Sequence, residues 1–140
     1  TTAMCNSFKQ ELLGGVHDLD TDTLKIALIK PSSTGTLGAG TANYSALGSD
    51  EATGTNYSAG GQTLDSASIT LSGSTVFVDF ADEVFTNLTI SAAGAIIYNS
   101  SQSNKAIAVF NFGTTVTSTA GDFTVVFPTA NASSAVIRIT

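Results

Sequence analysis

The sequence predicts a mainly β protein, a single antiparallel β-sandwich of jelly-roll-like type with a short N-terminal α-helix. Apolar residues recur at three- and four-residue steps only in the first 15 residues, which indicates one helix. Beyond them, short segments rich in Val, Ile, Phe and Thr alternate with Gly-, Ser- and Asn-rich turns, as in sandwiches and barrels. A length of 140 residues suits one core, so we assign residues 1–140 to a single domain.

The N-terminal segment, residues 1–15, is predicted to form a helix over residues 3–14. Met4, Phe8 and Leu12 follow a four-residue spacing and form one apolar stripe. Thr2 suits the N-cap position, and the glycines at 14–15 suit the end of a helix. A helix this short is marginally stable alone, so it must dock on a surface. That surface is either its own sandwich or another subunit or partner.

The first strand is predicted over residues 23–30, where Leu24, Ile26 and Leu28 share one face and Pro31 ends the run. A hairpin follows, with strands in 62–71 and 75–80 around a turn at 72–74. The remaining strands are predicted over residues 90–98, 105–112, 122–127 and 135–139, with polar turns at 99–104, 114–121 and 128–134.

Residues 31–61 form a long excursion of mainly Gly, Ser, Thr, Asn and Ala. Loops of this length are uncommon in compact domains. The segment is therefore either a functional excursion or a stretch with short edge strands. Tyr44 and Tyr57 are its candidate contact residues.

The charge content excludes several classes of partner. Charged residues make up 11% of the chain, and the net charge is −6. Nucleic acids and anionic membrane surfaces reward Lys and Arg, so we expect neither as a partner. The longest apolar run, residues 92–98, is far shorter than a membrane span. The polar surface comes instead from 17 Ser and 21 Thr, a composition that names no reaction.

Candidate catalytic residues are few. His17 is the only histidine, and no serine lies in a nucleophile-elbow motif, so we interpret His17 as a solvated turn residue. Asp79, Asp82 and Glu83 suggest a glycosidase pair, but a strand-end turn with Asp capping backbone N–H groups explains them more simply. The sequence therefore predicts no catalytic residue and no enzyme.

The acidic residues Asp18, Asp20 and Asp22 have the spacing that opens an EF-hand loop. Thr23 stands where that motif requires glycine, and Ile29 where it requires a bidentate glutamate. We therefore expect a polar turn, with no metal and no cofactor.

Cysteine and arginine each occur once in the chain. Cys5 lies on the apolar helix face and is expected to be a small buried hydrophobe. Arg138, the sole arginine, alternates with Ile137 and Ile139 in the last predicted strand. It is either an anchor at a subunit contact or a charge at the rim of one.

Short motifs in a fixed order extend over essentially the whole chain. Residues 4–13 (MCNSFKQELL) precede an acidic turn and residues 24–28 (LKIAL), and residues 54–64 (GTNYSAGGQTL) form a Gly/Tyr signature. The motifs at 79–82, 95–99, 112–113 and 135–139 continue the order. This order resembles a family of small virion proteins of tailed bacteriophages. Phe85 departs from the Trp usual near this position in that family, which bears on packing.

The resemblance implies a capsid decoration (cement) protein that binds the outside of a phage capsid and clamps neighbouring capsomers. It implies the major capsid protein as partner, a homo-oligomer with a trimer favoured, and a place on the outer capsid surface after synthesis in the host cytoplasm. The alternative is a virion carbohydrate-binding or host-adhesion module, with a hydrolase as a remote third. The candidate interface residues are Met4, Phe8, Leu12, Tyr44, Tyr57 and Arg138.

Overall fold

The computed structural model describes residues 2–65 and 67–140, and it confirms the predicted fold class. Strands account for 48% and helices for 13% of the residues, so the protein is mainly β. One antiparallel sheet has the strand order β1-β7-β6-β2-β3, and the other has the order β4-β5-β8. The elements are β1 (Ala3–Met4), α1 (Asn6–Leu13), β2 (Leu24–Ile29), η1 (Tyr44–Asp50), β3 (Gln62–Thr63), β4 (Ser68–Ser72), β5 (Thr75–Asp79), β6 (Glu83–Asn99), η2 (Ser100–Gln102), β7 (Lys105–Val125) and β8 (Ile137–Ile139).

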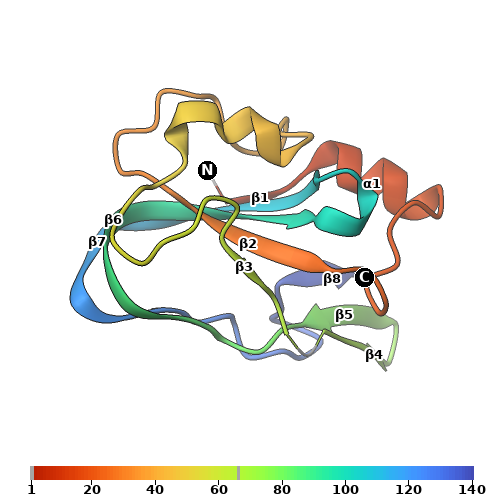
Figure 1. Ribbon diagram of the computed structural model, residues 1–140. Coiled ribbons are helices and arrows are strands. Elements are labelled where there is room, and N and C mark those ends of the chain that lie inside the picture. Colours follow the sequence, from red (N-terminus) through yellow and green to blue (C-terminus); the bar gives the residue numbers. More distant parts are fainter. Residues whose placement is uncertain (1, 66) are drawn as a thin grey trace.

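The layers are stacked around the five-stranded sheet. Figure 1 shows α1 and η1 above this sheet and the three strands β4, β5 and β8 below it. The interior strand β2, between β6 and β3, is consequently covered on both faces: Ala27 and Ile29 are buried as well as Ile26 and Leu28. The predicted alternation therefore describes only one of its two buried faces.

The long hairpin of β6 and β7 connects the layers. Its strands pair from Asn99 opposite Lys105 to Glu83 opposite Val125, and the register shifts at four places. Such shifts bend and twist a strand pair. The hairpin therefore curves together at the left of Figure 1 and runs back beneath the first sheet.

The prediction of a turn at 114–121 and a separate strand at 122–127 was wrong, because β7 continues without interruption from Lys105 to Val125. Thr, which dominates residues 114–119, is β-branched and fits an extended strand as readily as a loop. The start of β6 at Glu83, well before residue 90, was missed in the same way. Phenylalanines fill the bend beneath the first sheet, with ring pairs Phe80–Phe127, Phe110–Phe127, Phe85–Phe123 and Phe112–Phe123.

The N-terminal segment differs from the prediction in its first residues. Ala3 and Met4 pair with Val109 and Ala108 of β7, so α1 begins only at Asn6, with Cys5 at the N-cap position. Thr2 is not the cap, because its hydroxyl bonds to the backbone of Asn111. Pairing with the edge of β7 satisfies backbone groups of this segment outside a helix.

The excursion over residues 31–61 holds the 3-10 helix η1 and three isolated bridges, Ile29–Glu51, Asn43–Lys105 and Thr55–Thr89. The predicted hairpin is confirmed for β4 and β5, with Gly73 in its turn at a φ of 61°. The single strand predicted over residues 62–71 was wrong, because Gln62–Thr63 form β3 and pair with β2 in the other sheet. Within residues 2–65 and 67–140, no helix has the length and apolar character needed to cross a membrane.

Candidate functional site

An aliphatic face of the three-stranded sheet is the most distinctive surface feature. Ile69 pairs with Val78, and Val78 pairs with Ile137 on the other side of β5. In the next row, Leu71 pairs with Val76, and Val76 with Ile139. Paired residues project from the same side of a sheet, so all six side chains lie on one face.

This face forms one wall of a groove of about 220 Å³. The opposite wall comes from the end of α1 and the segment that follows it. The lining residues are Leu12, His17, Leu19, Ile69, Val76, Val78, Ile137 and Ile139. Seven of the eight are aliphatic, so the groove is a site for apolar groups.

The groove is filled at its inner end and uncovered at its outer end. Val78 and Ile137 are buried in the core, whereas Ile69 is 51%, Leu71 70% and Ile139 52% exposed. Contiguous exposed apolar surface of this kind marks interaction sites on soluble proteins. The outer half of the sheet face therefore has the character of a contact surface.

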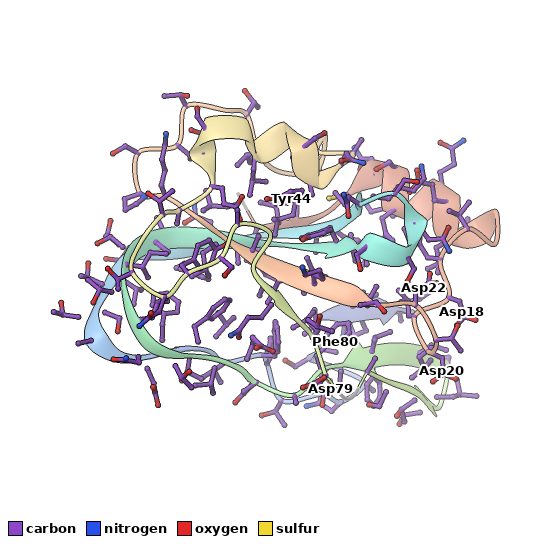
Figure 2. The ribbon with its side chains drawn as sticks, in the orientation of Figure 1. Asp18, Asp20, Asp22, Tyr44, Asp79 and Phe80 are labelled. Carbon is purple, nitrogen blue, oxygen red and sulfur yellow. The ribbon has the colours of Figure 1, made fainter. Side chains whose placement is uncertain are left out.

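Acidic side chains flank the groove. Asp18 and Asp20 lie on either side of the groove residue Leu19. Asp79 follows Val78 in β5, so it projects from the face opposite the groove. Figure 2 shows Asp18 and Asp20 beyond one end of the β4–β5 hairpin and Asp79 at the other end. Arg138 lies on the opposite face of β8, where its guanidinium donates to the carbonyl of Ala132 at 2.7 Å. The groove is therefore negative on the side of Asp18 and Asp20.

The floor beside the groove is a buried polar network around His17. The Nε2 atom of His17 lies 2.9 Å from Glu11 Oε2, and its Nδ1 lies 3.0 Å from Asn99 Nδ2. The ring also packs on Phe8, with 5.0 Å between the ring centroids. The interpretation of His17 as a solvated turn residue was wrong, because these partners satisfy both nitrogens in the interior.

The direction of each hydrogen bond in this network follows from Asn99. Its Oδ1 accepts from the backbone N–H groups of Ser101 and Gln102, so its amide NH₂ faces His17 and Asp22. His17 Nδ1 therefore accepts a hydrogen bond, and Nε2 carries the proton and donates to Glu11.

Two carboxylates of the network are held in the ionised form. Burial raises the pKa of Glu11, but the hydrogen bonds from Lys105 and His17 outweigh it, so the pKa is lowered. The hydrogen bond from Asn99 lowers the pKa of Asp22 against the effect of burial. The network links α1, the following turn, β6 and β7.

In the turn at residues 18–22, aspartate side chains accept hydrogen bonds from backbone N–H groups. Asp18 Oδ1 accepts from the N–H of Asp20 at 3.1 Å, and Asp22 Oδ2 accepts from the N–H of Asp18 at 3.0 Å. The predicted polar turn is confirmed. In the described part of the chain, no three His, Cys, Asp or Glu side chains gather as metal ligands would.

The tyrosines of the excursion converge on Glu51. Tyr44 and Tyr57 donate their hydroxyls to the two carboxylate oxygens, and the N–H of Gly60 donates to Oε1 at 2.7 Å. Tyr98 stacks on Tyr44 at 4.6 Å between centroids and donates to the carbonyl of Gly60. Burial and the adjacent carboxylate raise the pKa of Tyr44. The hydroxyls are thus engaged within the chain.

The acidic residues after β5 have separate surroundings. Asp82 Oδ1 accepts from the N–H of Phe127 at 2.9 Å, which confirms the predicted capping of a backbone N–H. Glu83 opens β6, and its pKa is raised by burial and by neighbouring Asp65. Asp79 closes β5 opposite Ser68.

The predicted interface residues do not lie together on one surface of the structure. Phe8 is fully buried in the core of its own chain, which corrects its place among the exposed contacts. Met4 lies in β1 and is partly buried, and Leu12 lines the groove. Tyr44 and Tyr57 belong to the Glu51 cluster, and Arg138 lies behind the groove.

Sequence reasoning missed that Ile69, Leu71 and Ile139, on the aliphatic face of β4 and β8, are exposed. Their alternation marks an apolar strand face, but it does not show that nothing in the chain covers its outer half. It also missed Glu51, although Asp50 and Glu51 are the only charged residues between positions 31 and 61. A lone charged pair in an uncharged segment with tyrosines is a signal for such a cluster.

A second hollow, of about 350 Å³, lies between residues 29–37 and the bend of β6 and β7 at Gly94 and Phe110. Half of its lining residues are Gly, Ser, Thr or Asn, and its only charged residue is Lys30. The Lys30 ammonium already binds the carbonyl of Ser49 at 2.8 Å and the carboxylate of Asp50 at 3.1 Å. This hollow therefore offers a ligand no free charge.

The groove is the stronger candidate, since it combines uncovered aliphatic surface with negative charge on one side. Its residues come from three separate parts of the chain, the end of α1, the β4–β5 hairpin and β8. Comparison with protein-family models, with curated proteins and with solved structures finds no match to this chain.

Proposed function

We propose that the protein is a structural virion protein that binds the outside of a phage capsid and cements neighbouring capsomers. The observation that carries this proposal is the uncovered aliphatic face of β4, β5 and β8, a surface suited to binding another protein. The ordered motifs that resemble small phage virion proteins supply the setting. The proposed partner is the major capsid protein, and the proposed assembly is a homotrimer.

An aliphatic contact surface is suited to cementing a capsid. A protein that binds only the assembled shell stabilises it by the free energy of binding at each site. Symmetry repeats the contact many times, so no single contact has to be strong. Aliphatic contacts also keep their strength in concentrated salt, which screens exposed ion pairs.

Purified virions test this function directly. We expect the protein in a copy number comparable to that of the major capsid protein, placed on the outer shell by electron cryo-microscopy. Particles that lack the protein should rupture at a lower temperature than complete particles. Adding the purified protein should return the rupture temperature to that of complete particles. A few copies confined to the tail would contradict the proposal.

The adhesion module is less favoured, because Tyr44 and Tyr57 donate their hydroxyls to Glu51 inside the chain. A sugar would have to compete with that carboxylate. Saturable glycan binding that is lost in Tyr57→Ala and kept in Arg138→Ala would favour adhesion over cementing.

A further inference from the structure

We propose that the groove binds an extended aliphatic segment of the partner protein, flanked by Lys or Arg, which adds as a strand along β4. This inference rests on the proposed function, since it names the part of the capsid protein that the site would bind. Three features of the groove support it: its side chains, its backbone edge and its charge.

The side chains define the apolar part of the occupant. A strand added beside β4 would extend the row of Ile69 and the row of Leu71 by one residue each. Two aliphatic side chains in alternate positions would therefore cover the exposed parts of Ile69 and Leu71. Leu12 and Leu19 supply the facing wall.

The backbone of β4 is open to a further strand. β4 is at the edge of its sheet, and within the described residues it pairs only with β5. All five of its residues are exposed. Edges of this kind bind extended peptides through main-chain hydrogen bonds, while side-chain pockets give specificity.

The acidic residues near the groove determine the charge of the occupant. Asp18 and Asp20 lie beyond one end of the hairpin, and Asp79 lies at the other end, where it projects from the face opposite the groove. The residues at the two ends of an added strand would therefore lie near acidic groups. The ammonium or guanidinium groups of flanking Lys or Arg residues would complement them. A second copy docking by a two-fold contact would instead set one acidic side against another in a chain of net charge −6.

Two synthetic peptides with an N-terminal fluorophore test the occupant: Lys-Val-Thr-Val-Thr-Val-Lys and the same peptide with Glu at both ends. Fluorescence anisotropy should show saturable binding of the Lys peptide to the full chain. The Glu peptide should bind about tenfold more weakly, because attraction to the acidic groups becomes repulsion at both ends of the peptide. We expect no larger difference, since each exposed ion pair contributes only a fraction of a kcal/mol. Concentrated salt should narrow this difference. Equal binding of both peptides, or binding of neither, would overturn the proposal.

Leu71→Lys, with Val126→Lys as a matched control, tests the place of binding. Both residues are 70% exposed. Leu71 lies on the aliphatic face of β4 beside the groove, whereas Val126 belongs to none of β4, β5 and β8. Neither substitution should alter the free energy of unfolding by more than about 0.5 kcal/mol. Leu71→Lys should weaken binding of the Lys peptide about tenfold or more, and Val126→Lys by less than about twofold. Equal losses in the two variants would place the binding elsewhere.

The remaining outcomes separate the two proposals. If wild-type protein self-associates in sedimentation equilibrium and Leu71→Lys abolishes this, the occupant is a second copy and the peptide proposal fails. If Leu71→Lys still cements capsids, capsid binding stands while the groove is not its contact. If the Lys peptide binds as expected but the protein is absent from the capsid shell, the groove proposal stands and the capsid role fails.

Discussion

Glu51 shows how one carboxylate orders a segment that has little hydrophobic material of its own. It accepts hydrogen bonds from two tyrosine hydroxyls and one backbone N–H, which come from η1 and from residues 57–60. Asp50 acts in parallel on the N–H groups of Thr34 and Gly35, which lower its pKa. The two acids thus hold opposite parts of the excursion.

Glu51→Ala is expected to lower the free energy of unfolding by about 3 kcal/mol, because three buried or half-buried donors lose a charged acceptor. Urea denaturation followed by far-UV circular dichroism measures the change. Glu51→Gln, which keeps one acceptor oxygen, should restore part of the stability. A loss below about 1 kcal/mol in Glu51→Ala would show that the cluster does not hold the excursion in place.

Other single residues differ in how far the sequence alone predicts them. Cys5 was predicted as a buried small hydrophobe, and it is fully buried, with its pKa raised to about 11 by that burial. The environment of His17 could not be predicted, because its partner Asn99 lies 82 positions away. A local pattern reports hydrophobic spacing, whereas a polar network depends on which distant strands meet.

At the scale of elements, the β4–β5 hairpin and β2 follow closely from their sequences, whereas the extent of β6 and β7 does not. In β4 and β5, alternation and a turn glycine act over a few residues. In β6 and β7, the boundaries depend on pairing between two strands that bulge together at several places. Residues 114–121 form a strand and not the predicted turn, because pairing with β6 outweighs the preference of their polar composition for a loop.

Two glycines with similar backbones give a test of element packing. Gly61 and Gly73 have φ values of 70° and 61°, so alanine is strained at both. A Cβ at Gly61 would also lie 1.8 Å from the carbonyl oxygen of Ile26 in β2, whereas nothing lies near Gly73.

We expect Gly73→Ala to cost about 1 kcal/mol of unfolding free energy and Gly61→Ala about 3 kcal/mol or more. Gly61→Ala adds a clash with the backbone of β2, so the entry into β3 must move. Thermal and urea unfolding of the two variants measure the difference. Equal costs would mean that residues 60–63 do not approach β2 this closely.

At the scale of the whole molecule, the polar network joins the helical layer to the central sheet through ionised groups. Glu11 and Asp22 both have lowered pKa values in the folded protein. Each therefore stabilises the fold at pH values above its ordinary pKa, 4.5 for Glu11 and 3.8 for Asp22, and loses that contribution as the pH falls through the lowered value.

We expect the free energy of unfolding to decrease on acidification from about pH 7 to about pH 3. Asp22→Asn should be less stable than wild type by about 1 kcal/mol near pH 7, and the difference should shrink in acid. Asp20→Asn is the control, since no hydrogen bond to the Asp20 carboxylate occurs within the described residues. Urea titrations across this range measure both curves, and a constant Asp22→Asn difference would contradict the linkage.

The sequence predicts the fold class, and it identifies the aliphatic strands of the groove as strands. It does not predict that their outer face stays uncovered, because that depends on how far the end of α1 and residues 16–19 reach across the small sheet. The network beneath the groove depends on the same geometry.

The gathering of all three tyrosines around Glu51 also determines what the ultraviolet absorbance and fluorescence of the protein report. With no tryptophan in the chain, Tyr44, Tyr57 and Tyr98 supply its absorbance near 280 nm and its ultraviolet emission. They sit in one cluster, so these signals report on the docking of the excursion. A partner that binds the groove would require an added chromophore to be seen, as in the labelled peptides.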